Sequence, residues 1–262
     1  NARFKELPSG YRPLDPAEVK QVNEDQAAAP AMPAQEPGIR DSCALPYELL
    51  VSGGLDKERQ VFAIQFRAGN TAFGRNASGA PFHVYAPGNY LQAGASPSKP
   101  LYGPCRSWAY AVAAGDTLPD AWPLSHFEGG DYKLEVYGPN GFFRSFKGNK
   151  NDPLLSIRDA YELPSSGAGA PADKLLLKIL NNHASQRIRV HLADRAYGIQ
   201  GQEREIPPGR EVLLAIETGE SHGWYDFTVR AEGYEAFAQR FAGRVETGLL
   251  RKSDPVMGNF NL

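Results

Sequence analysis

The stretch HGWYDFTV at 222–229 repeats a pattern that the chain has already used in GDYKLEV at 130–136. In both stretches a Tyr is followed at every second position by a hydrophobic residue and then by Val, with a Gly-containing turn and an aromatic run ending in Phe-x-Gly further on. Alternation with a period of two is typical of a strand that has one face on a core and the other in water. The core face would hold Tyr225, Phe227 and Val229.

The stretch 222–229 leads to two further predictions, one for its opposite face and one for Tyr225. Asp226, Thr228 and Arg230 alternate with the apolar residues, so the pattern places them in water. Tyr225 stands near the start of its strand, where a tyrosine can act as a corner residue whose hydroxyl bonds to nearby backbone. We interpret 222–229 as a core strand and not as a catalytic motif.

Other landmarks recur in the same order along the two halves of the chain. Short runs rich in β-branched and aromatic residues, separated by Gly, Pro and Asn turns, fill the sequence from residue 45 onward, and no long segment there has a helical apolar period. The sequence therefore predicts an all-β fold of two tandem antiparallel β-sandwiches, immunoglobulin-like, in copies at 41–150 and 151–248. The matched landmarks are Phe82-His83-Val84 with Val190-His191-Leu192, Val112 with Ile206, Tyr132 with Tyr225, and Phe146-x-Gly148 with Phe241-x-Gly243.

The ends of the chain lie outside the repeat. Residues 1–40 are rich in Pro and Ala and are predicted to be a linker that follows a missing domain, and 249–262 a C-terminal tail. The Asn1-Ala2 start is interpreted as a cloning remnant ahead of a fragment, so the lack of a signal peptide says nothing about export. Within the linker, DPAEVKQVNEDQ predicts one helix, with Asp15 as its N-cap and Pro16 at its first position.

Composition excludes several classes of protein. The 262 residues are 42% hydrophobic and 22% charged, within the range of a globular protein with a core. The net charge of −2 and a pI near 6.3 argue against a nucleic-acid partner. No apolar run is long enough to cross a membrane.

Catalytic and metal-binding motifs do not emerge from the sequence. The histidines lack the HExxH or HxH spacing of a metal site, there is no G-x-S-x-G elbow and no phosphate-cradling loop, and acidic pairs are those of an ordinary solvated surface. The sequence therefore predicts no catalytic residue, no metal ligand and no cofactor. The histidines are His83, His126, His183, His191 and His222.

Aromatic residues are more suggestive. Tyr85, Tyr90, Tyr102 and Trp108 flank a loop rich in Gly, Pro and Ser, and Phe142-Phe143 directly follow a Pro-Asn-Gly turn. Exposed aromatics on loop tips can enter a lipid interface or hold a quaternary ammonium by cation–π attraction. The alternative is that they cap the ends of the sandwiches. We retain Phe142, Phe143, Tyr85, Tyr90 and Trp108 as candidate contacts for a lipid surface or for a quaternary ammonium such as choline.

Cys43 and Cys105 stand beside predicted strand starts. In a reducing compartment they would be two thiols, whereas in an exported protein they would form a disulfide between neighbouring strand ends.

Three stretches resemble the C-terminal region of bacterial phosphocholine-preferring phospholipases C. They are QEPGIRDSCALPYELLVSGGLD, GGDYKLEVYGPNGFFRSFKGN and the closing HGWYDFTVRAEGYEAFAQRFAGRVETGLLRKSDPVMG, and the resemblance covers 37–258 in order. The final thirty or so residues are its most specific part. In that family a large N-terminal catalytic domain precedes two small β-domains.

The resemblance implies a bacterial protein that is secreted or periplasmic, commonly through the twin-arginine route. It also implies a parent enzyme that releases phosphocholine from phosphatidylcholine or sphingomyelin. The nucleophile and metal ligands of the family lie in the catalytic domain, so no catalytic residue transfers to this sequence. Export agrees with a Cys43–Cys105 bridge.

These observations lead to one interpretation and two rivals. The chain is expected to be a non-catalytic accessory region whose partners are its own catalytic domain, a choline-lipid surface or a chaperone. One rival is a free-standing binding or adhesion module for carbohydrate or protein, and an attached catalytic domain would contradict it. The other is an enzyme in its own right, which phosphocholine release by this chain alone would support.

Overall fold

The computed structural model describes residue 10 and residues 12–25, 37–92, 94–95, 99–164 and 171–258. The chain divides into two compact units, Asn1–Glu36 and Pro37–Leu262. In the first unit, helix α1 (Pro16–Glu24) begins where the sequence predicted, because the Asp15 carboxylate accepts from the backbone N–H groups of Ala17 and Glu18. The Glu18 side chain in turn accepts from the Asp15 N–H at 2.9 Å, which completes a capping box.

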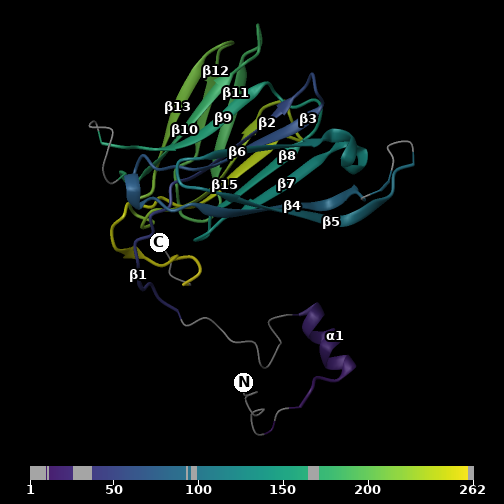
Figure 1. The fold of residues 1–262 in the computed structure, drawn as a ribbon, viewed down its shortest axis with the longest axis vertical. Helices are drawn as coiled ribbons and strands as arrows, with labels where there is room; N and C mark the ends of the chain where they lie inside the picture. The colour runs from purple at the N-terminus through teal and green to yellow at the C-terminus, as the bar shows by residue number, and fades with distance from the viewer. Residues whose placement is uncertain are drawn as a thin grey trace. The chain divides into compact units, whose positions relative to one another are not determined.

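The second unit is all-β and antiparallel, as the sequence predicted (Figure 1). One eight-stranded sheet has the order β12-β11-β14-β15-β8-β7-β4-β5, and two three-stranded sheets have the orders β2-β3-β6 and β13-β10-β9. Strands β1 (Asp41–Ser42) and β16 (Arg251–Lys252) pair separately with each other. The larger strands of the first half are β2 (Leu49–Asp56), β3 (Val61–Ala68), β4 (Ala80–Leu91), β5 (Tyr102–Val112), β6 (Thr117–Pro123), β7 (Tyr132–Tyr137) and β8 (Phe143–Gly148). Those of the second half are β9 (Leu155–Tyr161), β10 (Lys174–Asn181), β11 (Ile188–Asp194), β12 (Gln202–Ile206), β13 (Glu211–Glu217), β14 (Trp224–Ala231) and β15 (Ala238–Arg244).

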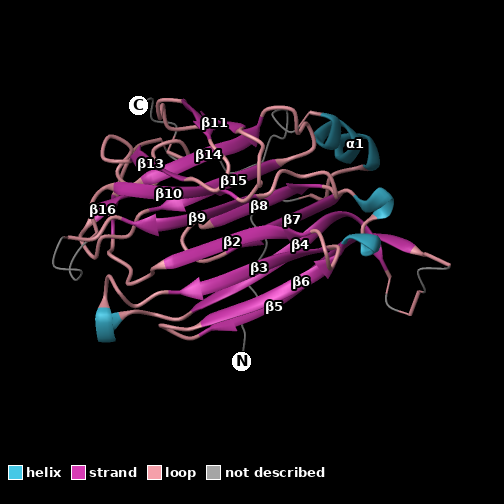
Figure 2. Ribbon diagram, turned by 90° about the horizontal axis from the view of Figure 1, so that it is seen from above, coloured by secondary structure: helices cyan, strands magenta, loops and turns pink. Residues whose placement is uncertain are grey.

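The strands form two layers. Seen from above, β9 lies beside β2, so that the two three-stranded sheets together cover the eight-stranded sheet (Figure 2). The inward faces of the two layers enclose two hydrophobic cores. The core of the first half is rich in aromatic rings, and that of the second half is mainly aliphatic.

The two halves use their strands in the same order. β2-β3-β6 over β5-β4-β7-β8 corresponds strand for strand to β9-β10-β13 over β12-β11-β14-β15. The joint is made by the corresponding strands β8 and β15, which pair with Ser145 opposite Arg240 and Phe146 opposite Gln239. Phe146 and Phe241 hold the same place in the repeated Phe-x-Gly motif, so the residues just before them, Ser145 and Arg240, also correspond. Because these two residues face each other across the joint, an approximate two-fold axis that relates the halves passes close to them.

This joint makes residues 37–262 a single compact unit, although the sequence suggested two tandem domains. The copy boundaries 41–150 and 151–248 therefore stay a prediction about the repeat in the sequence. They fall in the connection between β8 and β9 and after the end of β15.

The face of 222–229 that was predicted to be solvent-exposed is exposed only in part. Asp226 and Thr228 are buried, and only Arg230 is exposed, because β14 lies inside the sheet between β11 and β15. Arg240 on β15 covers Asp226 with two hydrogen bonds, of 2.7 and 2.5 Å. The Tyr225 hydroxyl accepts from the Arg144 guanidinium at 3.0 Å, so the predicted bond to backbone is replaced by a side-chain contact.

Candidate functional site

The aromatic residues singled out in the sequence do not form one exposed group. Phe142 and Tyr90 are core residues, with 4% and 6% of their surface exposed. The ring of Phe142 lies 4.1 Å from the buried Arg144 guanidinium, and no tip of the kind predicted exists there. Tyr85, Tyr90 and Trp108 are on strands β4 and β5 and not on loop tips.

Tyr90 and Trp108 pack edge to face, with ring centroids 5.2 Å apart, on the inner side of the β4–β5 hairpin. The Arg106 guanidinium lies 5.7 Å from both rings. A quaternary ammonium would have to displace this arginine to reach either ring. These two positions therefore serve packing in this structure.

Tyr85 and Phe143 belong to a row of rings on the outer face of the eight-stranded sheet. Tyr137 lies between them, with centroids 5.4 Å from Tyr85 and 5.0 Å from Phe143. The Arg240 guanidinium covers Phe143 at 5.3 Å, and both residues line a shallow depression of about 390 Å³. Tyr137, which the sequence analysis did not select, is the most exposed of the three rings at 43%.

The two cysteines lie in separate parts of the fold. Cys43 directly follows β1, and its carbonyl oxygen is 3.5 Å from a guanidinium nitrogen of Arg244. Cys105 is in β5 at the edge of the eight-stranded sheet. Both thiols are free and exposed, so this structure contains no bridge between them.

A cluster of polar contacts joins the two ends of the β-unit. We name it the clasp and define it as residues 37–43 and 244–258 together with the side chains that bind them. β1 pairs with β16, Asp41 opposite Lys252 and Ser42 opposite Arg251. Backbone hydrogen bonds of 2.8 Å extend this ladder, from Ser253 to Arg40 and from Gly38 to Gly258. A side chain on Gly258 would meet the Gly38 carbonyl oxygen at 2.5 Å, which explains the glycine there.

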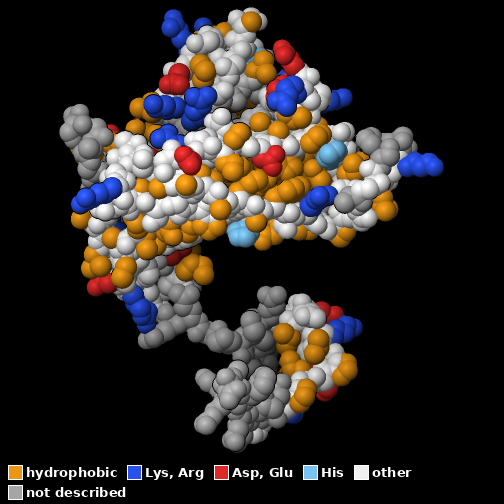
Figure 3. Space-filling view, in the orientation of Figure 1, with side chains coloured by type: hydrophobic (Ala, Val, Ile, Leu, Met, Phe, Trp, Pro, Cys, Tyr) orange, Lys and Arg blue, Asp and Glu red, His pale blue; other side chains and the backbone are white. Residues whose placement is uncertain are grey.

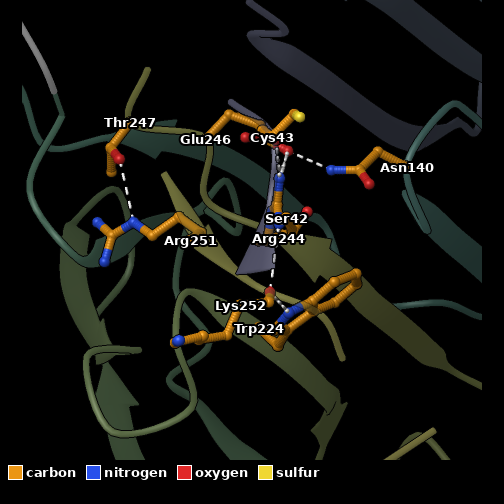
Figure 4. Close-up of polar contacts among 9 residues, drawn as sticks. All are labelled: Ser42, Cys43, Asn140, Trp224, Arg244, Glu246, Thr247, Arg251 and Lys252. Atoms are coloured by element: carbon orange, nitrogen blue, oxygen red, sulfur yellow. Dashed lines mark hydrogen bonds and ion pairs between the residues drawn. The ribbon is translucent and has the colours of Figure 1, made fainter. Parts of the chain in front are cut away.

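Arg244 is the hub of the clasp (Figure 4). Its guanidinium donates to Glu246 Oε1 at 2.7 and 3.0 Å and to the Ser42 hydroxyl at 2.9 Å, and it lies 5.4 Å from the Trp224 ring. Both members of the Arg244–Glu246 pair are buried. Removing one partner of a buried pair costs about 3–5 kcal/mol, because the other charge is left uncompensated. The clasp is therefore rigidly tied to the end of β15.

The environment of Glu246 is unusual for a carboxylate. Burial raises its pKa above the ordinary value, while hydrogen bonding and charge from Arg244 act in the opposite direction. Asn140 also donates to Oε1, and a hydrogen bond from the Leu45 backbone further opposes the rise in pKa. A second ion pair, between Arg251 and Asp173, fixes β16 to the segment that precedes β10.

Within the described part of the chain, no group of three or more His, Cys, Asp and Glu side chains is arranged to hold a metal ion. No described helix is both long and apolar enough to span a membrane. A depression of about 770 Å³ is lined by turns and edges around β12 and β13, with Glu203, Arg204 and Glu220 among its residues. On the face seen in Figure 3, hydrophobic side chains gather across the middle of the β-unit, and acidic and basic side chains are scattered.

Comparison with known families identifies the class of the chain. Residues 42–149 and 158–244 match the family model described as "Bacterial phospholipase C, C-terminal domain". Two separate matches fit the two sets of corresponding strands in the fold. The chain belongs to this family, as the resemblance in the sequence indicated.

Three curated relatives are named as phospholipases C. The non-hemolytic phospholipase C of Pseudomonas aeruginosa is 34% identical over 272 residues, which cover 98% of this chain and 34% of the relative. The non-hemolytic phospholipase C of Burkholderia pseudomallei is 34% identical over 250 residues, or 95% of this chain and 32% of the relative. The hemolytic phospholipase C of Pseudomonas aeruginosa is 30% identical over 233 residues, or 87% and 31%. The chain thus spans about a third of the length of these relatives.

Sequence reasoning did not find the clasp. Its residues lie at and beyond the ends of the repeated pattern, and a buried Arg244–Glu246 pair looks like an ordinary charged stretch when only the letters RVETGLLRK are read. One signal was available: the last thirty or so residues were the most specific part of the family resemblance.

Proposed function

We propose that this chain is the non-catalytic C-terminal accessory region of a secreted bacterial phospholipase C that acts on phosphatidylcholine and sphingomyelin, and that it supports a catalytic region preceding it. The observation that carries the proposal is the match of nearly the whole chain to one third of three phospholipases C, in a family described as the C-terminal domain. The clasp supports the role as an accessory region for a preceding part of the polypeptide. In the clasp, residues 37–42, where the chain enters the β-unit, are hydrogen-bonded to residues 251–258.

Phosphocholine release tests this proposal directly. A longer polypeptide that contains a preceding catalytic region should release phosphocholine from phosphatidylcholine and sphingomyelin vesicles, and the chain 1–262 should release none. Release by 1–262 alone would show that the chain is itself an enzyme. A longer polypeptide without activity would contradict the proposal and favour a binding or adhesion module.

Contact with a lipid surface is a second candidate function, and the outer ring row of Tyr85, Tyr137 and Phe143 favours it. Flotation of 1–262 with phosphatidylcholine and sphingomyelin vesicles should then depend on Tyr137. Tyr137→Ser should reduce co-flotation, and Tyr234→Ser, a tyrosine outside the row, should leave it unchanged. Equal flotation of both variants would exclude the ring row as the contact.

Export and a protein partner such as a chaperone remain part of the proposal. Titration of the thiols in the unreduced, native protein tests for export. Two reactive thiols would agree with the structure, whereas none would indicate a Cys43–Cys105 disulfide and hence an oxidising compartment.

A further inference from the structure

Exposed apolar side chains are concentrated on the clasp. Among the described residues, nine large hydrophobic residues are exposed, and four of them fall within 249–257. Leu250, Met257 and Leu249 expose 67%, 62% and 59% of their surface, and Val256 exposes 40%. We name these four residues the clasp patch. Four such residues within nine consecutive positions stand out, because exposed apolar residues that are scattered singly need no explanation.

The two turns that carry the clasp patch are held in place on both sides. Leu249 and Leu250 stand between the buried Thr247 and β16, and the Thr247 hydroxyl accepts from Arg251 Nε at 3.1 Å. Val256 and Met257 lie in a turn whose N–H groups donate to the Asp254 carboxylate at 2.9 and 3.3 Å.

A third contact connects the second turn to the rest of the β-unit. Tyr197 donates to the other oxygen of Asp254 at 2.9 Å. The two turns therefore present their apolar side chains on a fixed base, as a preformed docking surface does.

The charges around the patch argue against an anionic membrane as its occupant. The two basic residues that follow Leu250 are both paired, Arg251 with Asp173 and Lys252 with Asp41, the latter at 2.6 Å. Attraction to anionic lipid depends on basic residues that are free to face the membrane. An apolar surface with neutralised charges is compatible with the centre of a protein interface, where charged residues are depleted.

From these observations we infer that the clasp patch is the docking surface for the region of the same polypeptide that precedes this chain. The clasp itself names the occupant, because the incoming strand β1 is paired with β16 between the two apolar turns. A region joined to β1 through residues 1–36 is tethered to the same molecule as the patch, which raises its effective concentration there above that of a free partner. This inference rests on the proposed function, since about two thirds of each curated relative lies outside the match to a C-terminal domain.

Met257 gives a direct readout of whether the patch is covered. Its thioether is exposed in this chain and is expected to react readily with peroxide, which peptide mass spectrometry follows as methionine sulfoxide. In the full-length polypeptide the oxidation of Met257 should be slowed about tenfold, as expected for a docked state populated about 90% of the time. Equal oxidation rates in the chain 1–262 and in the full-length polypeptide would overturn the inference.

A pair of matched double variants separates docking from general destabilisation. Leu249→Ser/Leu250→Ser in the full-length polypeptide should restore fast oxidation of Met257. Leu101→Ser/Leu213→Ser removes two leucines that are 60% and 55% exposed elsewhere, and should leave the slow rate unchanged. Restoration by both double variants, or by neither, would contradict docking at this patch.

Two further oxidation measurements test for other occupants of the clasp patch. If phosphatidylcholine vesicles slow Met257 oxidation in 1–262 alone, the patch binds lipid and the inference is wrong. If the oxidation rate of 1–262 falls as its own concentration rises, the occupant is a second copy, and the inference is again wrong. Phosphocholine release is measured on the same full-length sample. Slow oxidation of Met257 in a polypeptide that releases no phosphocholine would refute the proposed function but would still support the docking surface.

Discussion

The two halves of the β-unit share one strand order and differ at the seam where they meet. On the first strand of each half, Gly53 and Asp159 hold corresponding places, since they pair with Ile64 on β3 and Leu177 on β10. On the last strand, Gln239 corresponds to Arg144 through the register of β8 and β15. Arg144 binds Asp159 at 2.5 Å, whereas Gln239 donates only to the Gly53 carbonyl oxygen, at 3.4 Å. One seam contact is thus a buried ion pair, and its counterpart is one weak neutral hydrogen bond.

The size of the core residues explains this difference. A side chain at Gly53 would meet the Phe62 ring at 2.7 Å and the Phe146 ring at 2.9 Å. In the second half the residue corresponding to Phe62 is Leu175, which is smaller and leaves room for the Asp159 side chain. The aromatic core of the first half therefore requires glycine at its seam, and the aliphatic core of the second half accommodates a carboxylate with its arginine.

The largest expected effect is that of Arg144→Met. This change leaves the Asp159 carboxylate buried without its cation, and we expect the free energy of unfolding to fall by about 3–5 kcal/mol. Urea unfolding followed by tryptophan fluorescence and by circular dichroism measures it. Arg144→Met/Asp159→Leu should recover most of the loss, since an apolar pair of similar volume can replace a buried ion pair. A single variant as stable as the parent chain would show that the ion pair contributes nothing at the seam.

Gly53→Ala comes next. The added methyl group has to displace two buried rings, and overpacking of this kind costs about 1–3 kcal/mol. The same unfolding measurement should show this loss, and Gly54→Ala, where no atom lies within 4 Å of the added carbon, provides the neighbouring control. Equal stability of the two alanine variants would mean that the core of the first half can repack as freely as that of the second.

Gln239→Met tests the other side of the seam with the substitution already used at Arg144. The variant loses a hydrogen bond of 3.4 Å, but it also removes the buried Gln239 Oε1, which has no partner. These two changes oppose each other, so we expect a shift within about 1 kcal/mol in either direction. A loss as large as that of Arg144→Met would show that the two contacts are energetically equivalent despite their different chemistry.

The smallest effect is a pH dependence that should appear in both halves. Burial lowers the pKa of His126 in the first half and of His183 in the second below the ordinary 6.5. Below pH 6.5 the unfolded chain takes up protons at these positions that the folded chain does not, so stability falls as the pH decreases toward the folded pKa values.

His126→Gln and His183→Gln should each remove part of the loss in stability between pH 7.5 and pH 5, and the exposed His83→Gln serves as the control. Comparing variants at each pH separates this contribution from Asp152 and Glu246, whose raised pKa values act in the opposite direction. If all three variants keep the parent pH profile, neither partly buried histidine contributes to it.

The sequence by itself determined the all-β class, the helix capped by Asp15, the doubling of strand order and the family. Each of these depends on local or periodic information: a cap is set by residues within one turn, a strand face by alternation, and a repeat by the order of its landmarks. Tyr225, Phe227 and Val229 are buried as the alternation predicted.

Only the tertiary structure decided which neighbours the strands acquired. Asp226 is buried because β15 brings Arg240 over it, and Phe142 is core because Arg144 and Phe82 surround it. The pairing of β8 with β15, the Arg144–Asp159 contact and the clasp join residues that lie 15 to more than 200 positions apart. Such contacts depend on how whole sheets are placed, and neither alternation nor spacing along the chain carries that information.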